Sequence, residues 1–150
     1  MIPIQNIYYM LSYAFQVLNE QGYKNIATEQ FTNTAELMAA ILEKGITIQL
    51  KRGPGKEYIP QTEALSSLRG KIDIADSIKT QSILRKQLIC TYDEFSVNSI
   101  MNRIIKSTVE LLLCSNISKL RKKNLRKLMV YFSEVDFIDL YTVNWNIQYN

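Results

Sequence analysis

The strongest constraint on the fold is an amphipathic segment between residues 96 and 113. One face of a helix drawn through it carries, at spacings of three and four residues, Val97, Ile100, Met101, Ile104, Ile105, Thr108, Val109 and Leu112. This period predicts a long helix with one buried face and with Ser96 as its N-cap. Asn102, Arg103 and Lys106 fall on the opposite face, which we expect to point into solvent.

A helix is also predicted near the N-terminus, over residues 6–20, with Gly22 closing it. Apolar residues surround this helix on most sides, so we expect it to be buried on most sides. Tyr8, Tyr9 and Tyr13 form a stripe on it. We interpret this stripe as packing within the core rather than as a platform for stacking a ligand.

The next helix is predicted from a start signal. Asn33 and Glu36 have the spacing of a capping box. Residues 46–50 alternate in polarity as a strand does, yet they also continue the helical face, and we favour a helix as far as Arg52. Gly53 opens a Gly-Pro-Gly turn that ends the element.

The middle of the chain has the pattern of a small sheet. Strands are predicted over residues 57–62, 69–75 and 88–95, and the proline in the first of them indicates an edge strand. The link between the first two strands fits either a hairpin or a wide connection. A short helix is predicted over residues 75–84, and a longer one over residues 117–132. The predicted fold class is α+β, mainly helical with a small antiparallel sheet.

Composition excludes several kinds of active site. The chain has no histidine, which removes Ser-His-Asp and Cys-His catalysis and every histidine-ligated metal. Cys90 and Cys114 are too few for a four-thiolate zinc site, and five glycines form no GxGxxG or Walker loop. We therefore predict no catalytic residue, metal or cofactor in this chain.

The same features indicate a compartment. Both cysteines lie in apolar stretches, so we expect buried, reduced thiols in a cytoplasmic protein. No apolar run approaches the roughly 18 residues of a membrane helix. The first residues also lack a basic region ahead of an apolar stretch, so no secretory signal is predicted.

The net charge of +4 is mild, but the basic residues are concentrated in one predicted helix. They are Lys119, Arg121, Lys122, Lys123, Arg126 and Lys127. This cluster could bind DNA phosphates weakly and without regard to sequence. Because it has no interleaved aromatic residues, a solvated helix face is the alternative interpretation.

Four stretches of the sequence together resemble one known family. They are IPIQNIYYMLSYAF near the N-terminus, LEKGITIQLKRG followed by EY, then LRGKIDIADSI, and finally TYDEFSVNSIMNRIIKSTVELLL. Their order and spacing, from Ile2 to about Leu113, are similar to those of the McrC subunit of the McrBC modification-dependent restriction system. Beyond Asn116 the resemblance fades.

The resemblance implies a two-component system. McrC-like proteins are nuclease subunits, and their partner McrB is an AAA+ motor that recognises methylated DNA and in most systems hydrolyses GTP. By this resemblance residues 1–116 form the part that docks on the McrB ring and stimulates its GTP hydrolysis. Residues 117–150 then hold the basic helix and the start of the following region.

The family's carboxy-terminal half has a PD-(D/E)xK nuclease fold that cuts DNA with Mg²⁺. The 150 residues contain no D/E-x-K triplet. We therefore expect a non-catalytic fragment, with Mg²⁺ belonging to the absent nuclease half and GTP to the McrB-like partner. As alternatives to docking, the chain could be a stand-alone nucleic-acid-binding module or a structural adaptor of a phage-defence complex.

Two sets of residues are candidates for contact with the McrB ring. They are the helix face formed by Asn102, Arg103 and Lys106, and the turn residues Lys51, Arg52, Arg69 and Lys71. An arginine can bind a carboxylate or phosphate through two hydrogen bonds, and basic turns could form a tip that enters or caps a ring. For both sets an ordinary solvated surface is the alternative.

Overall fold

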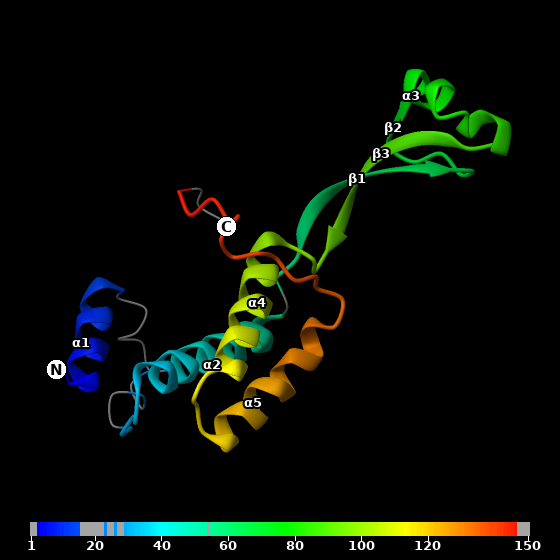
Figure 1. The fold of residues 1–150 in the computed structure, drawn as a ribbon. Helices are drawn as coiled ribbons and strands as arrows, with labels where there is room; N and C mark the ends of the chain where they lie inside the picture. Colours follow the sequence, from blue (N-terminus) through cyan, green and yellow to red (C-terminus); the bar gives the residue numbers. More distant parts are fainter. Residues whose placement is uncertain (1–2, 16–22, 24–25, 27–28, 54, 147–150) are drawn as a thin grey trace. The chain divides into compact units, whose positions relative to one another are not determined.

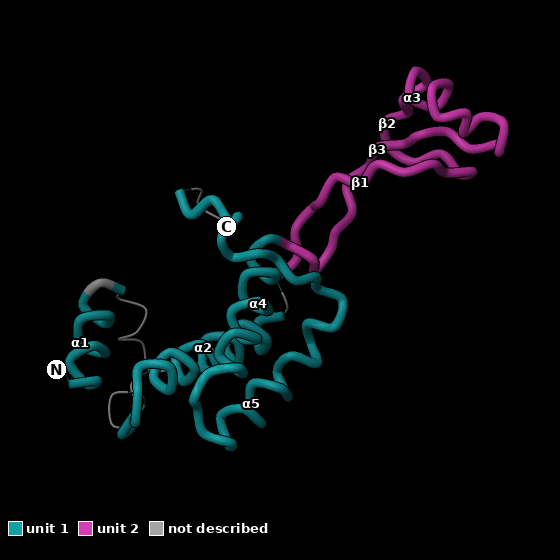
Figure 2. The backbone as a smooth tube through the Cα atoms, viewed as in Figure 1, with its two compact units in different colours: residues 1–55, 100–150 teal, residues 56–99 magenta. Residues whose placement is uncertain are grey.

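The chain forms two compact units, shown in different colours in Figure 2. The computed structural model describes residues 3–15, 23, 26, 29–53 and 55–146. Unit 1 comprises residues 1–55 and 100–150, and unit 2 comprises residues 56–99. Unit 2 is therefore an insertion into the sequence of unit 1.

The boundary expected after residue 116 does not coincide with these units. The basic helix belongs to unit 1, together with the two long helices that precede it in unit 1.

Unit 1 is helical in its described part (Figure 1). Its elements are α1 (Ile4–Ala14), α2 (Thr34–Arg52), α4 (Ile100–Cys114), α5 (Lys119–Met129) and the 3-10 turn η4 (Val130–Phe132). Helices α2, α4 and α5 pack against one another, and α1 packs against α2. The basic segment predicted over residues 117–132 is thus confirmed as α5 followed by η4.

Helix α2 confirms the start signal and rejects the strand alternative. The side chain of Asn33 accepts a hydrogen bond of 2.8 Å from the backbone N–H of Glu36. The helix then continues through residues 46–50 to Arg52. Leu37 and Ile46 are both buried, and since nine residues separate them they lie on opposite sides of the helix, so α2 is covered on more than one side.

Helix α4 begins later than the amphipathic pattern predicts. The extended strand before it runs as far as Ser96, and the helix starts at Ile100. Ser96 is therefore not the helix N-cap; its hydroxyl accepts a hydrogen bond of 3.1 Å from the N–H of Asn98 within the connection.

The prediction that α1 is buried on most sides is wrong. Tyr8 is buried in a core cluster with Tyr23, Ile26 and Leu37, but Tyr13 is 92% exposed and Tyr9 is also exposed. One face of this short helix packs on its neighbours, and no described residue covers the other. The C-terminal part of the predicted helix, residues 16–20, and Gly22 lie outside the described residues.

The two thiols differ in their surroundings. Cys90 is buried, as predicted, whereas Cys114 is exposed at the end of α4. Cys114 lies in a helix, so its apolar neighbours in the sequence point in other directions: Leu112 and Leu113 are half-buried, whereas Cys114 is exposed.

Unit 2 contains a three-stranded antiparallel sheet, which confirms the predicted α+β class. Its strands are β1 (Glu57–Leu65), β2 (Lys71–Asp73) and β3 (Leu88–Ser96), in the spatial order β1-β3-β2. Because β1 and β2 both pair with β3, the link between them is a wide connection and not a hairpin. β1 is an edge strand, as its proline indicates.

The short helix predicted over residues 75–84 is divided into two pieces. Helix α3 (Ile74–Lys79) is capped by Asp73, whose carboxylate accepts a 2.9 Å hydrogen bond from the N–H of Asp76. The 3-10 turn η3 (Ser82–Arg85) follows it. Figure 1 shows α3 at one end of the sheet.

Gly70 is required where the chain enters β2. Its φ angle is +62°, in the left-handed region that side chains disfavour. A Cβ atom built on it would lie 2.2 Å from the carbonyl oxygen of Thr91 on β3. The backbones of the two strands therefore approach too closely for any other residue.

We predict that Gly70→Ala lowers the stability of unit 2 by more than about 2 kcal/mol, since it combines left-handed strain with a backbone collision. Gly53→Ala is the matched control. Gly53 also has a positive φ, +102°, but a Cβ there would meet nothing within 4 Å. Hydrogen exchange of the β3 amides measures the difference, and equal protection in the two variants would contradict the steric argument.

Candidate functional site

The polar face of α4 is covered by other parts of unit 1, so the expectation that it points into solvent is wrong. Asn102 is 2% exposed, and its side-chain N–H donates a 2.7 Å hydrogen bond to the carbonyl of Gly55. Arg103 forms an ion pair of 3.3 Å with Asp136. These contacts join residues that are far apart in the sequence, and helical periodicity cannot predict such contacts.

Lys106 fastens the segment after α5 onto α4. Its ammonium donates hydrogen bonds to the carbonyls of Phe132, at 2.9 Å, and Val135, at 2.5 Å. The same ammonium lies 4.7 Å from the centre of the Phe137 ring. A role of Arg103 or Lys106 in binding a partner stays a prediction, but both groups already have structural partners within the chain.

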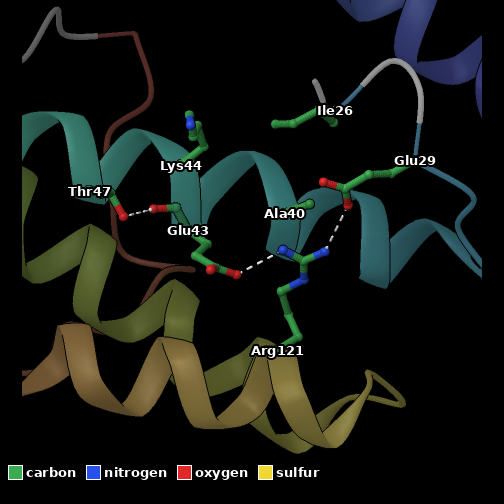
Figure 3. A pocket seen from close by; sticks show the side chains of 7 residues that line it. All are labelled: Ile26, Glu29, Ala40, Glu43, Lys44, Thr47 and Arg121. Carbon is green, nitrogen blue, oxygen red and sulfur yellow. Dashed lines mark hydrogen bonds and ion pairs between the residues drawn. The ribbon is translucent and has the colours of Figure 1, made fainter. Parts of the chain in front are cut away.

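Arg121 is the centre of an ion-pair cluster in unit 1 (Figure 3). Its guanidinium lies 2.8 Å from Glu43, 3.1 Å from Glu29 and 3.4 Å from Glu36. The side chain is only 19% exposed. The guanidinium thus connects α5 with α2 and with the segment that precedes α2.

Two further side chains complete what we call the Arg121 cluster. Ser118, the N-cap of α5, donates its backbone N–H at 2.8 Å and its hydroxyl at 2.9 Å to the carboxylate of Glu36. Asn124 donates a 3.0 Å hydrogen bond to Glu43. The cluster therefore consists of Glu29, Glu36, Glu43, Ser118, Arg121 and Asn124.

These contacts shift the pKa values in the cluster. Burial by itself would raise the pKa of Glu36, but the hydrogen bonds from Ser118 and the charge of Arg121 outweigh it and lower that pKa. For Arg121, burial would lower the pKa, and the carboxylates of Glu43 and Glu29 more than compensate and raise it. Both groups are consequently charged in the folded state at neutral pH.

A polar pocket of about 300 Å³ lies beside the Arg121 cluster. It is lined by Ile26, Glu29, Ala40, Glu43, Lys44, Thr47 and Arg121 (Figure 3). The carboxylates of Glu29 and Glu43 both bind Arg121. These charged groups of the pocket therefore already have partners within the protein.

The remaining basic residues of α5 lie at the surface. Lys119, Lys123, Arg126 and Lys127 are exposed and Lys122 is half-buried. Within the described part of the chain none of these five forms an ion pair. Arg121, by contrast, is paired with three carboxylates within the protein, and its role in binding DNA stays a prediction.

The basic turn residues belong to different units. Lys51 and Arg52 are exposed in the last turn of α2, where positive charge interacts favourably with the helix dipole. In unit 2, Lys71 is exposed in β2, and the guanidinium carbon of Arg69 lies 4.5 Å from the centre of the Tyr92 ring. The structure therefore describes them as two separate candidate surfaces.

Sequence reasoning missed a group of exposed apolar residues in unit 2. They are Leu68, Ile74, Ile78, Ile83 and Leu84. Two signals were available: isoleucines four residues apart in a short helix, and no acidic residue between positions 77 and 92, where Lys79, Arg85 and Lys86 are found. Exposed apolar side chains accompanied by basic ones are suited to binding another macromolecule.

The described residues carry two further negative findings. Among residues 3–15, 23, 26, 29–53 and 55–146, no group of three or more His, Cys, Asp or Glu side chains could hold a metal ion. In the same part of the chain, no helix has the length and apolar character needed to cross a membrane.

Fold and surface define the class as a mainly helical α+β protein whose three-stranded sheet is inserted between α2 and α4. The model of the McrBC 5-methylcytosine restriction system component family matches residues 4–146. The chain belongs to this family. The resemblance to McrC stated from the sequence is thereby confirmed.

Relatives and solved structures agree with this assignment. The chain is 33% identical over 112 residues to the type IV methyl-directed restriction enzyme EcoKMcrBC of Escherichia coli (strain K12), covering 75% of this chain and 32% of that protein. The chain thus spans about a third of the length of this curated relative.

Two solved structures share the fold. The Thermococcus gammatolerans McrBC complex contains a chain matched with a TM-score of 0.65 at 22% identity, over 95% of this chain and 46% of that one. A half-complex of T. gammatolerans McrB AAA+ hexamers with bound McrC gives 0.62 at 21% identity, over 85% and 33%.

We predict that Arg121→Leu destabilises the protein by about 3 kcal/mol, because three carboxylates lose their common partner inside the protein. Arg126→Leu, at an exposed position of the same helix, should change the stability by less than about 0.5 kcal/mol. Urea unfolding measures both. Adding Glu43→Gln to Arg121→Leu should restore part of the loss, and a cost for Arg121→Leu no larger than for Arg126→Leu would contradict the cluster's role.

The lowered pKa of Glu36 predicts a loss of stability in acid. A carboxylate with a lower pKa in the folded state than in the unfolded state stabilises the fold above its ordinary pKa of 4.5, and this contribution disappears as the pH falls below that value. Unfolding measured between about pH 7 and pH 3 should show a smaller decline for Glu36→Gln than for wild type. Exposed Glu110→Gln is the control and should retain the wild-type slope.

Proposed function

We propose that this chain is the part of a McrC-like subunit that docks on a McrB-like AAA+ ring and stimulates its GTP hydrolysis. Family membership supports this proposal, together with the likeness of fold over 95% of the chain to a component of the T. gammatolerans McrBC complex. That likeness carries the proposal because it includes both units of the chain. The proposed assembly resembles the T. gammatolerans half-complex, in which McrC is bound to McrB AAA+ hexamers.

In this proposal the chain itself cuts no DNA. Cleavage and its Mg²⁺ belong to a PD-(D/E)xK nuclease half, of which the 150 residues contain no D/E-x-K triplet, and GTP belongs to the partner. We place the system in the cytoplasm, which suits the two free thiols, Cys90 and Cys114. The system would act in defence against modified foreign DNA.

We favour the basic turn of unit 2 over the α4 face as the docking surface. Asn102 is buried, Arg103 is paired with Asp136 and Lys106 is bound to backbone carbonyls, so using them would disrupt contacts within unit 1. Lys71 is exposed and forms no ion pair within the described residues. Lys51 and Arg52 are exposed too and are a second candidate surface.

We further propose that contact with DNA through this chain is weak and independent of sequence. The exposed residues Lys119, Lys123, Arg126 and Lys127 on α5 support it, because clustered exposed cations bind phosphates. Such binding weakens steeply as the salt concentration rises, since it depends on the release of counterions.

We predict that Lys71→Ala weakens binding to the cognate McrB-like ring severalfold and reduces the stimulation of GTP hydrolysis, because a charge at the interface is lost. Lys127→Ala is the matched control, as it removes an exposed lysine from α5. Pull-down and GTPase assays with purified partner compare the variants after circular dichroism has shown that each is folded.

Two results would count against this assignment. If wild-type chain neither binds the ring nor stimulates it, the docking function is wrong. If the wild type binds and Lys71→Ala behaves like Lys127→Ala, the docking surface lies elsewhere, and Lys51→Ala and Arg52→Ala become the next variants to test.

A further inference from the structure

Ile83 and Leu84 are two adjacent apolar residues exposed in η3, between α3 and β3. Leu84 is 80% exposed and Ile83 is also exposed. The next two residues, Arg85 and Lys86, are exposed and basic. An apolar pair bordered by positive charge is therefore presented on the surface of unit 2.

The backbone that presents this pair is held in an unusual conformation. Gln81 and Lys86 flank η3 with φ angles of +54° and +57°, and among the described residues they are the non-glycine positions with positive φ. This conformation is energetically costly for residues other than glycine, and it persists only where the surroundings impose it. Strained residues of this kind are found preferentially at functional sites.

Hydrogen bonds of two buried serines connect η3 to α3 and to the start of β3. Ser77 and Ser82 are fully buried, and the hydroxyl of Ser82 donates a 3.2 Å hydrogen bond to the carbonyl of Ser77. The hydroxyl of Ser77 in turn accepts a 2.7 Å hydrogen bond from the N–H of Ile89, the second residue of β3. The N–H of Gln87 donates to the carbonyl of Ser82 at 3.1 Å. Ile83 and Leu84 therefore lie in a segment that is hydrogen-bonded to its neighbours.

We propose that Ile83 and Leu84 form a preorganised apolar anchor through which unit 2 binds the AAA+ partner, in a pocket that is apolar inside and acidic at its rim. This inference rests on the proposed docking function and names the contact that provides its affinity. A few residues that fill well-packed pockets of the partner usually dominate the energy of an interface. Preorganisation lowers the entropic cost of binding, because the anchor is already ordered in the free protein.

The charges around the anchor specify the partner's chemistry. Arg85 and Lys86 lie in a stretch, residues 77–92, that contains no acidic residue. Acidic groups around the partner's pocket would steer association and fix the orientation. Nucleic acid could use the two cations but would leave the exposed leucine without an apolar partner, so the observations favour a protein surface.

The test compares two exposed leucines. Leu84→Ser should weaken binding of the full chain to the purified, nucleotide-loaded McrB-like ring by at least about tenfold, the loss expected when a buried leucine contact is removed. Leu120→Ser is the control, because Leu120 is 70% exposed in α5 of unit 1. It should bind like wild type.

The possible outcomes distinguish a failure of the proposed anchor from a failure of the proposed docking function. If wild type binds and Leu84→Ser binds equally well, the anchor is overturned while the docking function stands. An equal loss in Leu84→Ser and Leu120→Ser also overturns it, since the effect is then not local to η3. If wild type does not bind, the docking function itself fails, and the inference with it.

A second variant tests preorganisation without removing the anchor. Gln81→Gly keeps the charge and both apolar side chains but frees the backbone at the left-handed position. It should remain folded and bind severalfold more weakly. Wild-type affinity in Gln81→Gly would overturn the claim that the strained backbone contributes to binding. Arg85→Glu should weaken binding most at low salt, and unchanged binding there would overturn the acidic rim.

Discussion

The helical unit depends on the ion pairs of one arginine. Arg121 binds carboxylates on α2 and on the segment before it, 78 to 92 residues away along the chain. A charge removed from water is costly unless it is paired, so Arg121 specifies how α5 lies against α2. The same contacts engage the guanidinium of Arg121 within the protein. Glu36, which also binds the N-cap of α5, makes the contact specific to one register.

The contacts within the protein determine which side chains stay exposed. On α4, Lys106 and Arg103 bind the segment after α5, so these two side chains already have partners within the fold. Unit 2 has its own hydrogen-bonded sheet and exposes several basic and apolar side chains. A protein that must remain folded while it binds a motor can place its interaction surface in such an insertion, because changes there leave the helical core intact.

Local signals in the sequence predicted most of the elements. The Asn33–Glu36 spacing located the start of α2, and the edge position of β1 followed from its proline. Each of these depends on neighbours within a few residues. Even the capping box was only half predicted: the carboxylate of Glu36 binds Ser118 and Arg121, far along the chain.

Contacts between distant residues account for what the sequence did not predict. The period of α4 placed Asn102 on a polar face, but Asn102 is buried and donates a hydrogen bond to the carbonyl of Gly55, 47 residues away. The sequence does not distinguish among the six basic residues of α5. In the described part of the chain, Arg121 is the one among them that pairs with three carboxylates. Likewise, apolar Tyr13 predicted burial, and only the packing of α1 shows which of its faces is covered. The absence of acidic residues from positions 77–92 is visible in the sequence, but which apolar side chains of η3 are exposed depends on its backbone conformation.

Our central proposal is that residues of unit 2 bind the McrB-like ring, while the ion pairs of unit 1 maintain the helical fold. Hydrogen exchange of the full chain, alone and bound to its cognate McrB-like ring, tests it directly. The account predicts slower exchange on binding for the amides of residues 68–87, with unchanged exchange in α5. Slower exchange confined to α4 and α5, with residues 68–87 exchanging as in the free chain, would contradict it.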